Sequence, residues 1–284
     1  SLRQATIIRD KLGLNPLIVS LSYPPDQITK LGAYNFSNLI ENGFDCLKLN
    51  LDPIRWKILM KHSFIKFCNW CRSTEMALYA SPIHMSLFQE IKVLFYGENF
   101  LYTVAHGTKD EGESWDAINL YKGGNTTKGG PASLEYSKAS QLDFYFYNYP
   151  NMREVKKSKT KIVYLGYFID DWYGYVNGNL AIKKGFKIRK DKAENTGDLW
   201  NFTGVDEDFR IVNQHLKYLK RGYGYVTDQV CEGIHQGLFD RKKAIDLVAK
   251  FDGKCGDEYI EKFCKFLSIT RNEYENVVEK FVIH

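Results

Sequence analysis

The sequence predicts an α/β protein, with a doubly wound parallel sheet followed by a helical C-terminal region. Three observations lead to this class. Short apolar runs such as 16–21 and 92–96 have strand length, amphipathic helices alternate with them, and helical spacing without strands continues from about residue 200. A strand covered by helices on both faces forms a continuous apolar run. We therefore expect an α/β domain over 1–200 and a helical region over 201–284.

The first hundred residues contain repeated units in which a helix precedes a strand. Asp52 followed by Pro53 marks the start of one helix, because aspartate caps the free N–H groups and proline is tolerated in the first turn. Gly32 lies inside another helical stretch and weakens it. The expected order is helix 2–12, strand 16–21, helix 26–42, strand 44–49, a long helix from residue 53, a helix over 82–91 and a strand over 92–96.

The second half of the chain is read in the same way. A glycine-rich stretch over 97–131 separates the early units from a last strand over 161–169, and such a stretch is either a functional loop or partly disordered. Thr270 and Glu273 have capping-box spacing, and Asp240 and Asp257 suit helix starts. The expected C-terminal helices are 206–219, 228–237, 241–251, 257–267 and 270–281.

Composition narrows the classes of function. Thirty-nine basic side chains against 34 acidic ones give a net charge of +5, without the basic stripe that nucleic-acid binding requires. This modest charge suits phosphate-bearing small molecules such as nucleotide sugars. No apolar stretch reaches membrane-spanning length, so no membrane span is expected. Six scattered cysteines are too few for a disulfide scaffold and favour a reducing, cytoplasmic setting.

Two predicted strands end in groups that could bind a nucleotide. In open α/β sheets, ligands bind at the carboxyl ends of the strands. Gly97, Glu98 and Asn99 follow one strand; the carboxylate could hold Mg²⁺ and the amide could form hydrogen bonds, although a plain turn is the simpler interpretation. The backbone of Val19, Ser20 and Leu21 ends another strand and could contact adenine.

Cys68 and Cys71 have the spacing of a metal-binding pair. A structural zinc site needs four ligands, and no second pair of this spacing follows in the chain. Zinc binding therefore depends on partners from elsewhere, and buried unligated thiols are the alternative. A redox-active dithiol is disfavoured, because no thioredoxin-like context surrounds the pair.

The segment 217–228 is the densest polar cluster. Lys217, Arg221, Tyr223 and Thr227 could clamp a phosphate or another part of a substrate, with Asp228 as a catalytic carboxylate beside them. The structural alternative is a helix end whose cations suit its dipole, followed by a cap at the start of the next helix. The sequence leaves both interpretations open.

Several blocks, taken in order, resemble the N-acetyl sugar amidotransferases, a branch of the PP-loop ATP pyrophosphatases. Their order and spacing are more specific than any single block. The blocks are Ser1 to Gln4 running on to 14–19, Val93 to Asn99, 162–168, and Gly222 to Asp228, with the closing helices around 246–253 and 272–280.

The resemblance implies features that the numbered sequence does not contain. Family members have a strand and an SGGKDS phosphate loop before the first helix, and Ser1 matches the last serine of that loop. We expect this segment to precede Ser1, together with cysteines that could complete a zinc site with Cys68 and Cys71.

The resemblance also implies a reaction and its participants. ATP and Mg²⁺ would activate the acetamido oxygen of a nucleotide-linked sugar as an adenylate, and ammonia from a separate glutaminase subunit would give an acetamidino group. Such sugars enter lipopolysaccharide O-antigen or flagellar nonulosonates. Two alternatives remain open: a tRNA-modifying enzyme of the same superfold, by thiolation or lysidine formation, and a non-catalytic subunit that docks a glutaminase.

Overall fold

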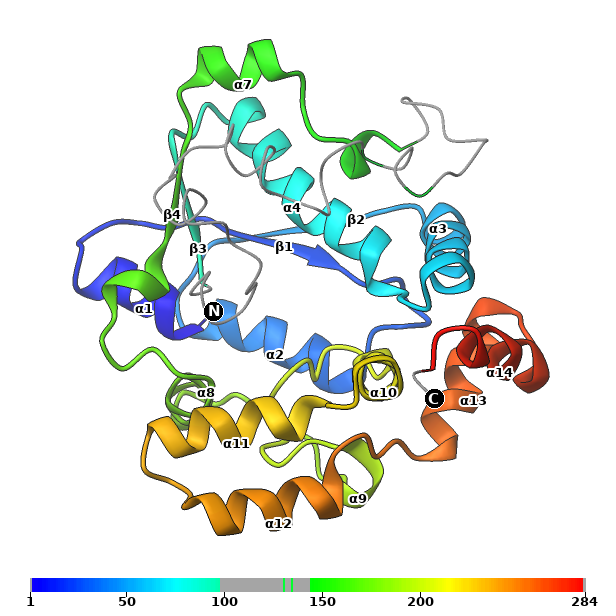
Figure 1. The fold of residues 1–284 in the computed structure, drawn as a ribbon. Coiled ribbons are helices and arrows are strands. Elements are labelled where there is room, and N and C mark those ends of the chain that lie inside the picture. The colour runs from blue at the N-terminus through cyan, green and yellow to red at the C-terminus, as the bar shows by residue number, and fades with distance from the viewer. Residues whose placement is uncertain (1, 98–129, 131–133, 135–143, 283–284) are drawn as a thin grey trace. The chain divides into compact units, whose positions relative to one another are not determined.

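Four short parallel strands and a larger set of helices make up the part of the chain that the structure describes, as Figure 1 shows. The computed structural model describes residues 2–97, 130, 134 and 144–282. These residues form two compact units, each built from several segments of the chain. The first unit comprises Ser1–Ser22, Phe44–His62 and Cys71–Trp172, and the second comprises Tyr23–Gly43, Ser63–Trp70 and Tyr173–His284.

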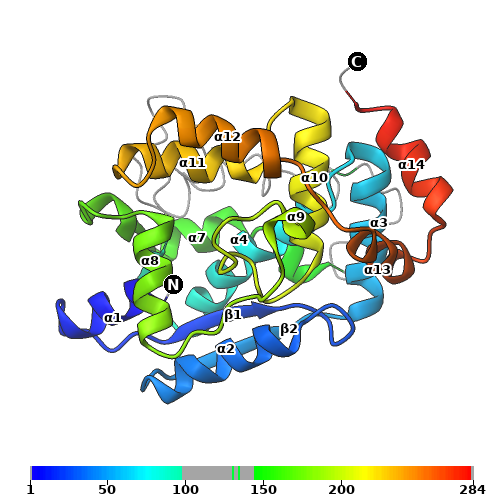
Figure 2. The same ribbon diagram turned by 90° about the horizontal axis from the view of Figure 1, so that it is seen from below.

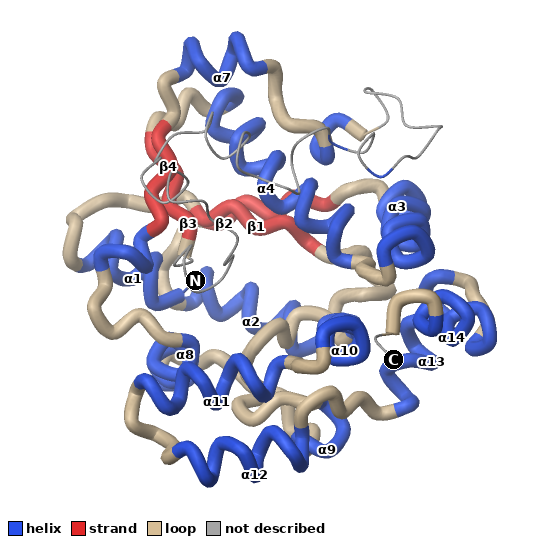
Figure 3. The backbone as a smooth tube through the Cα atoms, in the orientation of Figure 1, coloured by secondary structure: helices blue, strands red, loops and turns tan. Residues whose placement is uncertain are grey.

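The described strands all belong to the first unit and are drawn red in Figure 3. β1 (Ile18–Ser22) pairs in parallel with β2 (Cys46–Asn50). β3 (Val93–Tyr96) pairs in parallel with β4 (Lys161–Tyr164), so that both strands end at the same edge, Tyr96 opposite Tyr164. The parallel pairing confirms the α/β character that the sequence predicted.

The single doubly wound sheet is not evident among the described residues. β1–β2 and β3–β4 are two separate two-stranded sheets. The helix α4 (Cys71–Phe88) contacts both β1 and β3. An apolar run identifies a buried strand but not its neighbour, since pairing is decided by groups far apart in the chain. This limit explains why the strands were located correctly while the sheet was not.

Helices of the first unit surround these strands. Ile83 of α4, Val155, Ile162 and Tyr164 form a buried cluster, and full burial of one such side chain contributes roughly 1.5–3 kcal/mol. The elements of this unit are α1 (Leu2–Asp10), α4, the short α7 (Met152–Ser158) and the 3-10 turns η2 (Tyr145–Tyr147) and η3 (Leu165–Phe168); α3 (Pro53–Phe67) begins here and ends in the second unit.

Two predicted boundaries in this unit are wrong. The helix expected over 82–91 is the second half of α4, which begins at Cys71 and contains Pro82 in its interior. Proline removes one helical hydrogen bond and crowds the preceding turn. The helix continues because its apolar face, including Met76 and Ile83, is fully buried. The strand expected over 161–169 ends at Tyr164, and η3 follows it.

The second unit is helical, which confirms the predicted C-terminal helical region. α10 ends in a left-handed Gly222, and α11 and α12 lie side by side as an antiparallel pair (Figures 1 and 2). Its helices are α2 (Lys30–Glu41), α8 (Gly174–Lys183), α9 (Ala193–Thr196), α10 (Phe209–Arg221), α11 (Tyr225–His235), α12 (Arg241–Phe251), α13 (Asp257–Leu267) and α14 (Arg271–Glu279).

Local capping signals explain where several of these helices begin. Asp240 caps α12 by accepting a hydrogen bond from the Lys243 backbone N–H at 2.7 Å. Thr270 and Glu273 form the predicted capping box at the start of α14. Each cap satisfies backbone donors that a helix start otherwise leaves unpaired, which typically contributes about 1 kcal/mol.

Aromatic rings form the core of the second unit. The Phe64 ring stacks on Tyr274 with centroids 5.4 Å apart, and it meets Phe263 edge-on at 5.2 Å. Phe209 contacts Phe263 at 5.3 Å, and Trp70 contacts Phe209 at 6.4 Å. Edge-to-face and offset pairs of this kind add about 0.5–1.5 kcal/mol each beyond the area they bury.

Candidate functional site

The carboxyl end of β3 is the strongest candidate site in the first unit. Gly97 directly follows β3, and its carbonyl oxygen accepts two hydrogen bonds from side chains. Gln4 Nε2 donates at 3.1 Å and Trp172 Nε1 donates at 2.9 Å. Gln4 lies in the first turn of α1, so the structure brings the start of this helix to the strand end where ligands of parallel sheets bind.

An ion pair holds the same region together. Arg3 pairs with the Asp171 carboxylate, and its Nη1 also donates to the Asp171 carbonyl oxygen at 3.0 Å. The Arg3 side chain is largely buried, whereas the Asp171 side chain is exposed. Because both contacts lie on one residue, they fix the chain just before Trp172 and thereby aim its indole at Gly97.

Tyrosine side chains lie at the carboxyl ends of β3 and β4. Tyr96 and Tyr164, the paired last residues of β3 and β4, stack with ring centroids 5.6 Å apart. Tyr79 of α4 lies 6.0 Å from Tyr96. One helical turn before Tyr79, burial raises the pKa of the Glu75 carboxyl to about 7, while the positive charge of Arg72 partly opposes the shift. A carboxyl group with this pKa can exchange a proton near neutral pH.

The predicted adenine contact lies on β1. Val19, Ser20 and Leu21 face Leu47, Lys48 and Leu49 of β2 in the parallel register. Among the described residues no strand pairs with the opposite edge of β1. The backbone contact to adenine stays a prediction, as do the roles of Ser1, Glu98 and Asn99, which lie outside the described residues.

The structure gathers most of the predicted clamp in the second unit. Lys217 Nζ lies 2.5 Å from the Asp228 carboxylate and 4.5 Å from the centre of the Tyr223 ring. The Thr227 hydroxyl donates to Asp252 at 2.6 Å, and Arg221 is the exposed last residue of α10. These contacts join neighbouring helices to one another, and the clamp itself stays a prediction.

Asp252 rather than Asp228 caps the helix in this cluster. The helix expected to start at Asp228 begins at Tyr225, so Asp228 lies within its first turn. Asp252 accepts hydrogen bonds from the backbone N–H groups of Gly224 at 2.8 Å and Val226 at 3.0 Å. A cap this distant in sequence leaves no local spacing signal, which is why the boundary was predicted incorrectly.

The turn that carries Cys68 is tightly held within the second unit. Cys68 has a left-handed backbone with φ of 46° and is only 1% exposed. Lys220 Nζ donates to the carbonyl oxygens of Phe67 at 2.9 Å and Cys68 at 3.3 Å, and Ser63 donates to Asn69 at 2.6 Å. Lys220 thereby satisfies carbonyl groups at the end of α3 that the helix leaves unpaired.

The environment of Cys68 favours the neutral thiol in this conformation. Burial raises the pKa of its thiol to about 11, whereas zinc binds the thiolate. Cys71 is half-buried at the start of α4. In the part of the chain that the structure describes, no group of three histidine, cysteine or acidic side chains could hold a metal ion. The zinc assignment therefore stays a prediction that depends on ligands from other residues.

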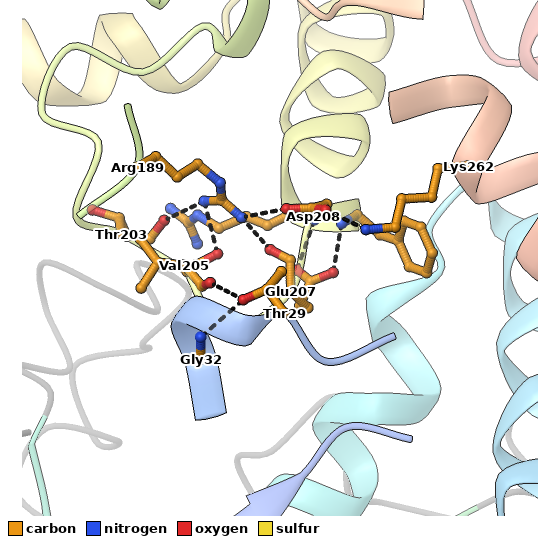
Figure 4. Close-up of polar contacts among 11 residues, drawn as sticks. Thr29, Gly32, Arg189, Thr203, Val205, Glu207, Asp208 and Lys262 are labelled. Carbon is orange, nitrogen blue, oxygen red and sulfur yellow. Dashed lines mark hydrogen bonds and ion pairs between the residues drawn. The ribbon is translucent and has the colours of Figure 1, made fainter. Parts of the chain in front are cut away.

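Several buried ionisable side chains of the second unit surround the start of α10 (Figure 4). Arg189, 7% exposed, donates to the Gly204 carbonyl at 3.0 Å and to the Asp208 carboxylate at 3.1 Å. The Glu207 carboxylate accepts the backbone N–H groups of Phe209 at 2.6 Å and Arg210 at 2.7 Å. Burial and the nearby Asp206 raise the pKa of Glu207 to about 8.

This cluster is a scaffold that anchors α2. Thr29 donates from its hydroxyl to the Val205 carbonyl at 2.7 Å and accepts the Gly32 N–H at 2.9 Å, which caps the helix. Gly32 is required by close approach, because a Cβ atom there would lie 2.5 Å from the Asp206 Cα. The contacts in Figure 4 either cap the starts of α2 and α10 or join separate segments of the second unit, and this pattern indicates a structural role.

Comparison with known proteins connects the C-terminal region to surface-polysaccharide synthesis. Residues 197–284 match the family model of the C-terminal domain of WbpG-like lipopolysaccharide biosynthesis proteins. The match covers about a third of the chain and includes α10 to α14. It supports the link to lipopolysaccharide biosynthesis that the resemblance implied. No curated protein matches the chain.

A search for membrane-crossing segments gave a negative result. Among the described helices, none combines the length and the apolar character needed to traverse a bilayer. This finding agrees with the absence of a long apolar run in the sequence.

Three residues of the candidate site were missed by the sequence analysis. Gln4 lies in the first block of the resemblance, which assigned no role to it, and Trp172 and Glu75 belong to no motif. The position of Gly97 directly after a strand was predicted correctly, since an apolar run is a local signal, while its role in nucleotide binding stays a prediction. Contacts between residues far apart in the chain revealed Gln4 and Trp172, and the effect of burial on its pKa revealed Glu75.

Proposed function

We propose that this chain is the ATP-using component of an N-acetyl sugar amidotransferase in lipopolysaccharide biosynthesis. The observation that carries the proposal is the match of residues 197–284 to the C-terminal domain of WbpG-like lipopolysaccharide biosynthesis proteins. The ordered resemblance of blocks in the first unit supports the assignment to ATP chemistry. Parallel strands whose carboxyl ends are lined by polar side chains suit this use.

The proposed reaction overcomes the low reactivity of an acetamido group. The acetamido oxygen attacks the α-phosphorus of ATP and pyrophosphate leaves, so that the oxygen becomes part of a good leaving group. Ammonia then attacks the acetamido carbon, AMP departs with the oxygen, and a proton is released to leave an acetamidino group. Positioning of the three reactants and stabilisation of developing charge supply much of the catalysis.

The residues assigned to this reaction come mainly from the first unit. The edge of β1 at Val19–Leu21, with which no described strand pairs opposite β2, suits contact with adenine. Glu98 and Asn99 are proposed to bind Mg²⁺ and nucleotide after Gly97. Glu75, whose pKa is raised to about 7, is a suitable group to accept the proton released by the attacking nitrogen. A nucleotide-linked sugar and a glutaminase subunit that supplies ammonia are the proposed substrate and partner.

The test is a coupled assay on protein that includes any residues the gene encodes before Ser1. Candidate N-acetyl nucleotide sugars are incubated with ATP, Mg²⁺ and ammonium, and AMP, pyrophosphate and the sugar product are measured. We expect AMP formation that requires an N-acetyl sugar, together with an acetamidino product. A failure to form AMP with any such sugar, in protein that binds ATP, would contradict the proposal. Transfer of sulfur or lysine to tRNA would assign the chain to the alternative class.

A further inference from the structure

Gln4 is an unusual residue within the candidate site, because one end of its amide is satisfied and the other is not. The side chain is 5% exposed. Its Nε2 donates to the Gly97 carbonyl oxygen at 3.1 Å. Its Oε1 is enclosed, and no donor of the described residues forms a hydrogen bond with it. An enclosed carbonyl oxygen without a donor costs free energy, so such atoms are rare in native proteins.

The orientation of this amide follows from its neighbours. The Gly97 carbonyl oxygen can only accept hydrogen bonds, so the Gln4 atom that faces it must be the donor Nε2. The indole of Trp172 donates to the same oxygen at 2.9 Å and holds it in place. Oε1 is therefore fixed as a hydrogen-bond acceptor at the carboxyl end of β3.

We propose that Oε1 of Gln4 accepts a hydrogen bond from a reactant nitrogen, either the incoming ammonia or the N–H of the acetamido group. This inference rests on the proposed function. Phosphate oxygens carry negative charge and cannot pair with a carbonyl oxygen, so the acceptor does not suit the phosphates of ATP. Both nitrogen-bearing reactants are N–H donors, and either would complete the unsatisfied amide.

The test compares Gln4→Met, which removes the acceptor at similar volume, with Trp172→Phe as the matched control. Trp172→Phe removes the other donor to Gly97 and leaves the Gln4 acceptor unchanged. For Gln4→Met we expect about a 10-fold to 100-fold loss in kcat/KM for ammonium or for the N-acetyl sugar. The reactant whose KM rises identifies the bound nitrogen, while KM for ATP stays within about 2-fold. The fold-loss in kcat/KM for Trp172→Phe should be less than a third of the fold-loss for Gln4→Met.

Other results would overturn the proposal. Equal losses in the two variants would show that Gln4 only positions Gly97, and a rise confined to KM for ATP would place the amide on the adenine. Unchanged kinetics in Gln4→Met would mean that a water satisfies Oε1. If Gln4→Met does not fold, Gln4→Asn keeps a polar amide but withdraws the acceptor, and the same selective loss is expected. Wild-type protein without any AMP formation would instead refute the proposed function.

Discussion

The carboxyl end of β3 and the junction between α10 and α11 differ in how their polar groups are satisfied. At the helix junction, Lys217 pairs with Asp228, and Asp252 accepts hydrogen bonds from Gly224, Val226 and Thr227. At β3, Gln4 keeps an enclosed acceptor that no described donor reaches. Polar density in the sequence pointed to the junction, where the side chains named above bond to one another; enclosed acceptors without a described donor lie on both sides of the comparison, Gln4 Oε1 beside β3 and Gln214 Oε1 on α10. The comparison teaches that a dense polar cluster in the sequence can be used up by contacts within the fold, as the Lys217–Asp228 and Asp252 contacts show.

Gly32→Ala gives the largest expected effect and tests whether the second unit is a rigid scaffold. The new Cβ would lie 2.5 Å from Asp206 Cα and 2.8 Å from its carbonyl oxygen, so the backbone must move. We expect a loss of about 1–3 kcal/mol in the free energy of unfolding, measured by urea denaturation. An open helix position would instead gain up to about 1 kcal/mol from the same change.

The control for Gly32→Ala is Ser37→Ala, on the exposed face of the same helix α2. It should change the unfolding free energy by less than about 0.5 kcal/mol. A stabilised Gly32→Ala variant would show that α2 is not fixed against the segment that carries Asp206, and the scaffold interpretation of Figure 4 would be wrong.

Asp252→Asn and Asp228→Asn compare two carboxylates of one helix junction. Asp252 accepts two buried N–H groups and the Thr227 hydroxyl, so its replacement should cost about 1–3 kcal/mol of unfolding free energy. Asp228 is exposed and forms one ion pair, which predicts a loss below about 1 kcal/mol. Thermal unfolding of both variants measures the difference.

Measuring kcat and KM of the Asp252→Asn and Asp228→Asn variants separates structural from functional roles at the junction between α10 and α11. If the contacts are structural, Asp228→Asn keeps wild-type kcat and KM for the sugar. If KM for the sugar instead rises 10-fold or more in Asp228→Asn without a change in stability, the cluster acts as a substrate clamp.

Glu207 gives the smallest expected effect, a change in pH dependence. Burial raises the folded-state pKa to about 8 from an ordinary value of 4.5, so the folded protein favours the protonated carboxyl. Its stabilising contribution is complete below pH 4.5 and is lost as the pH rises from 4.5 through about 8. Glu207→Gln cannot titrate. The melting temperature of the wild type should therefore fall relative to that of Glu207→Gln as the pH rises through this range.

The measurement is a set of melting curves for both proteins across the window from pH 4.5 to 8. Parallel curves would mean that Glu207 has no raised pKa in the folded state. A wild-type melting temperature that rises relative to that of Glu207→Gln with increasing pH would show that the ionised carboxylate is the favoured form, held by the N–H groups of Phe209 and Arg210.

Much of the fold was predictable because its signals are local. The start of α12 at Asp240 and the capping box of α14 depend on residues three positions apart. Strand positions followed from apolar runs. The pairing of β1 with β2 and of β3 with β4, without one continuous sheet, depends on contacts that no local pattern encodes. Pro82 was misread for the same reason, because burial of α4 outweighs the local cost of proline.

The candidate site was predictable only in part. The end of β3 before Gly97 was located correctly, and the rule that ligands bind at the carboxyl ends of strands needs only the end of a strand to propose a site there. Gln4 and Trp172 reach that edge from 93 and 75 residues away in the chain. A glutamine in an amphipathic helix has no distinguishing spacing, so only the structure reveals its unsatisfied oxygen.

The most direct test of the central claim is a single-turnover experiment with isotopically labelled ammonium and an N-acetyl nucleotide sugar. Wild-type protein and Gln4→Met are compared at limiting ammonium, with AMP and labelled sugar measured together by mass spectrometry. The account predicts that wild type forms one labelled acetamidino sugar per AMP, and that Gln4→Met forms the labelled product at least about 10-fold more slowly. Equal rates of labelling in the two proteins, or AMP without labelled sugar in the wild type, would contradict it.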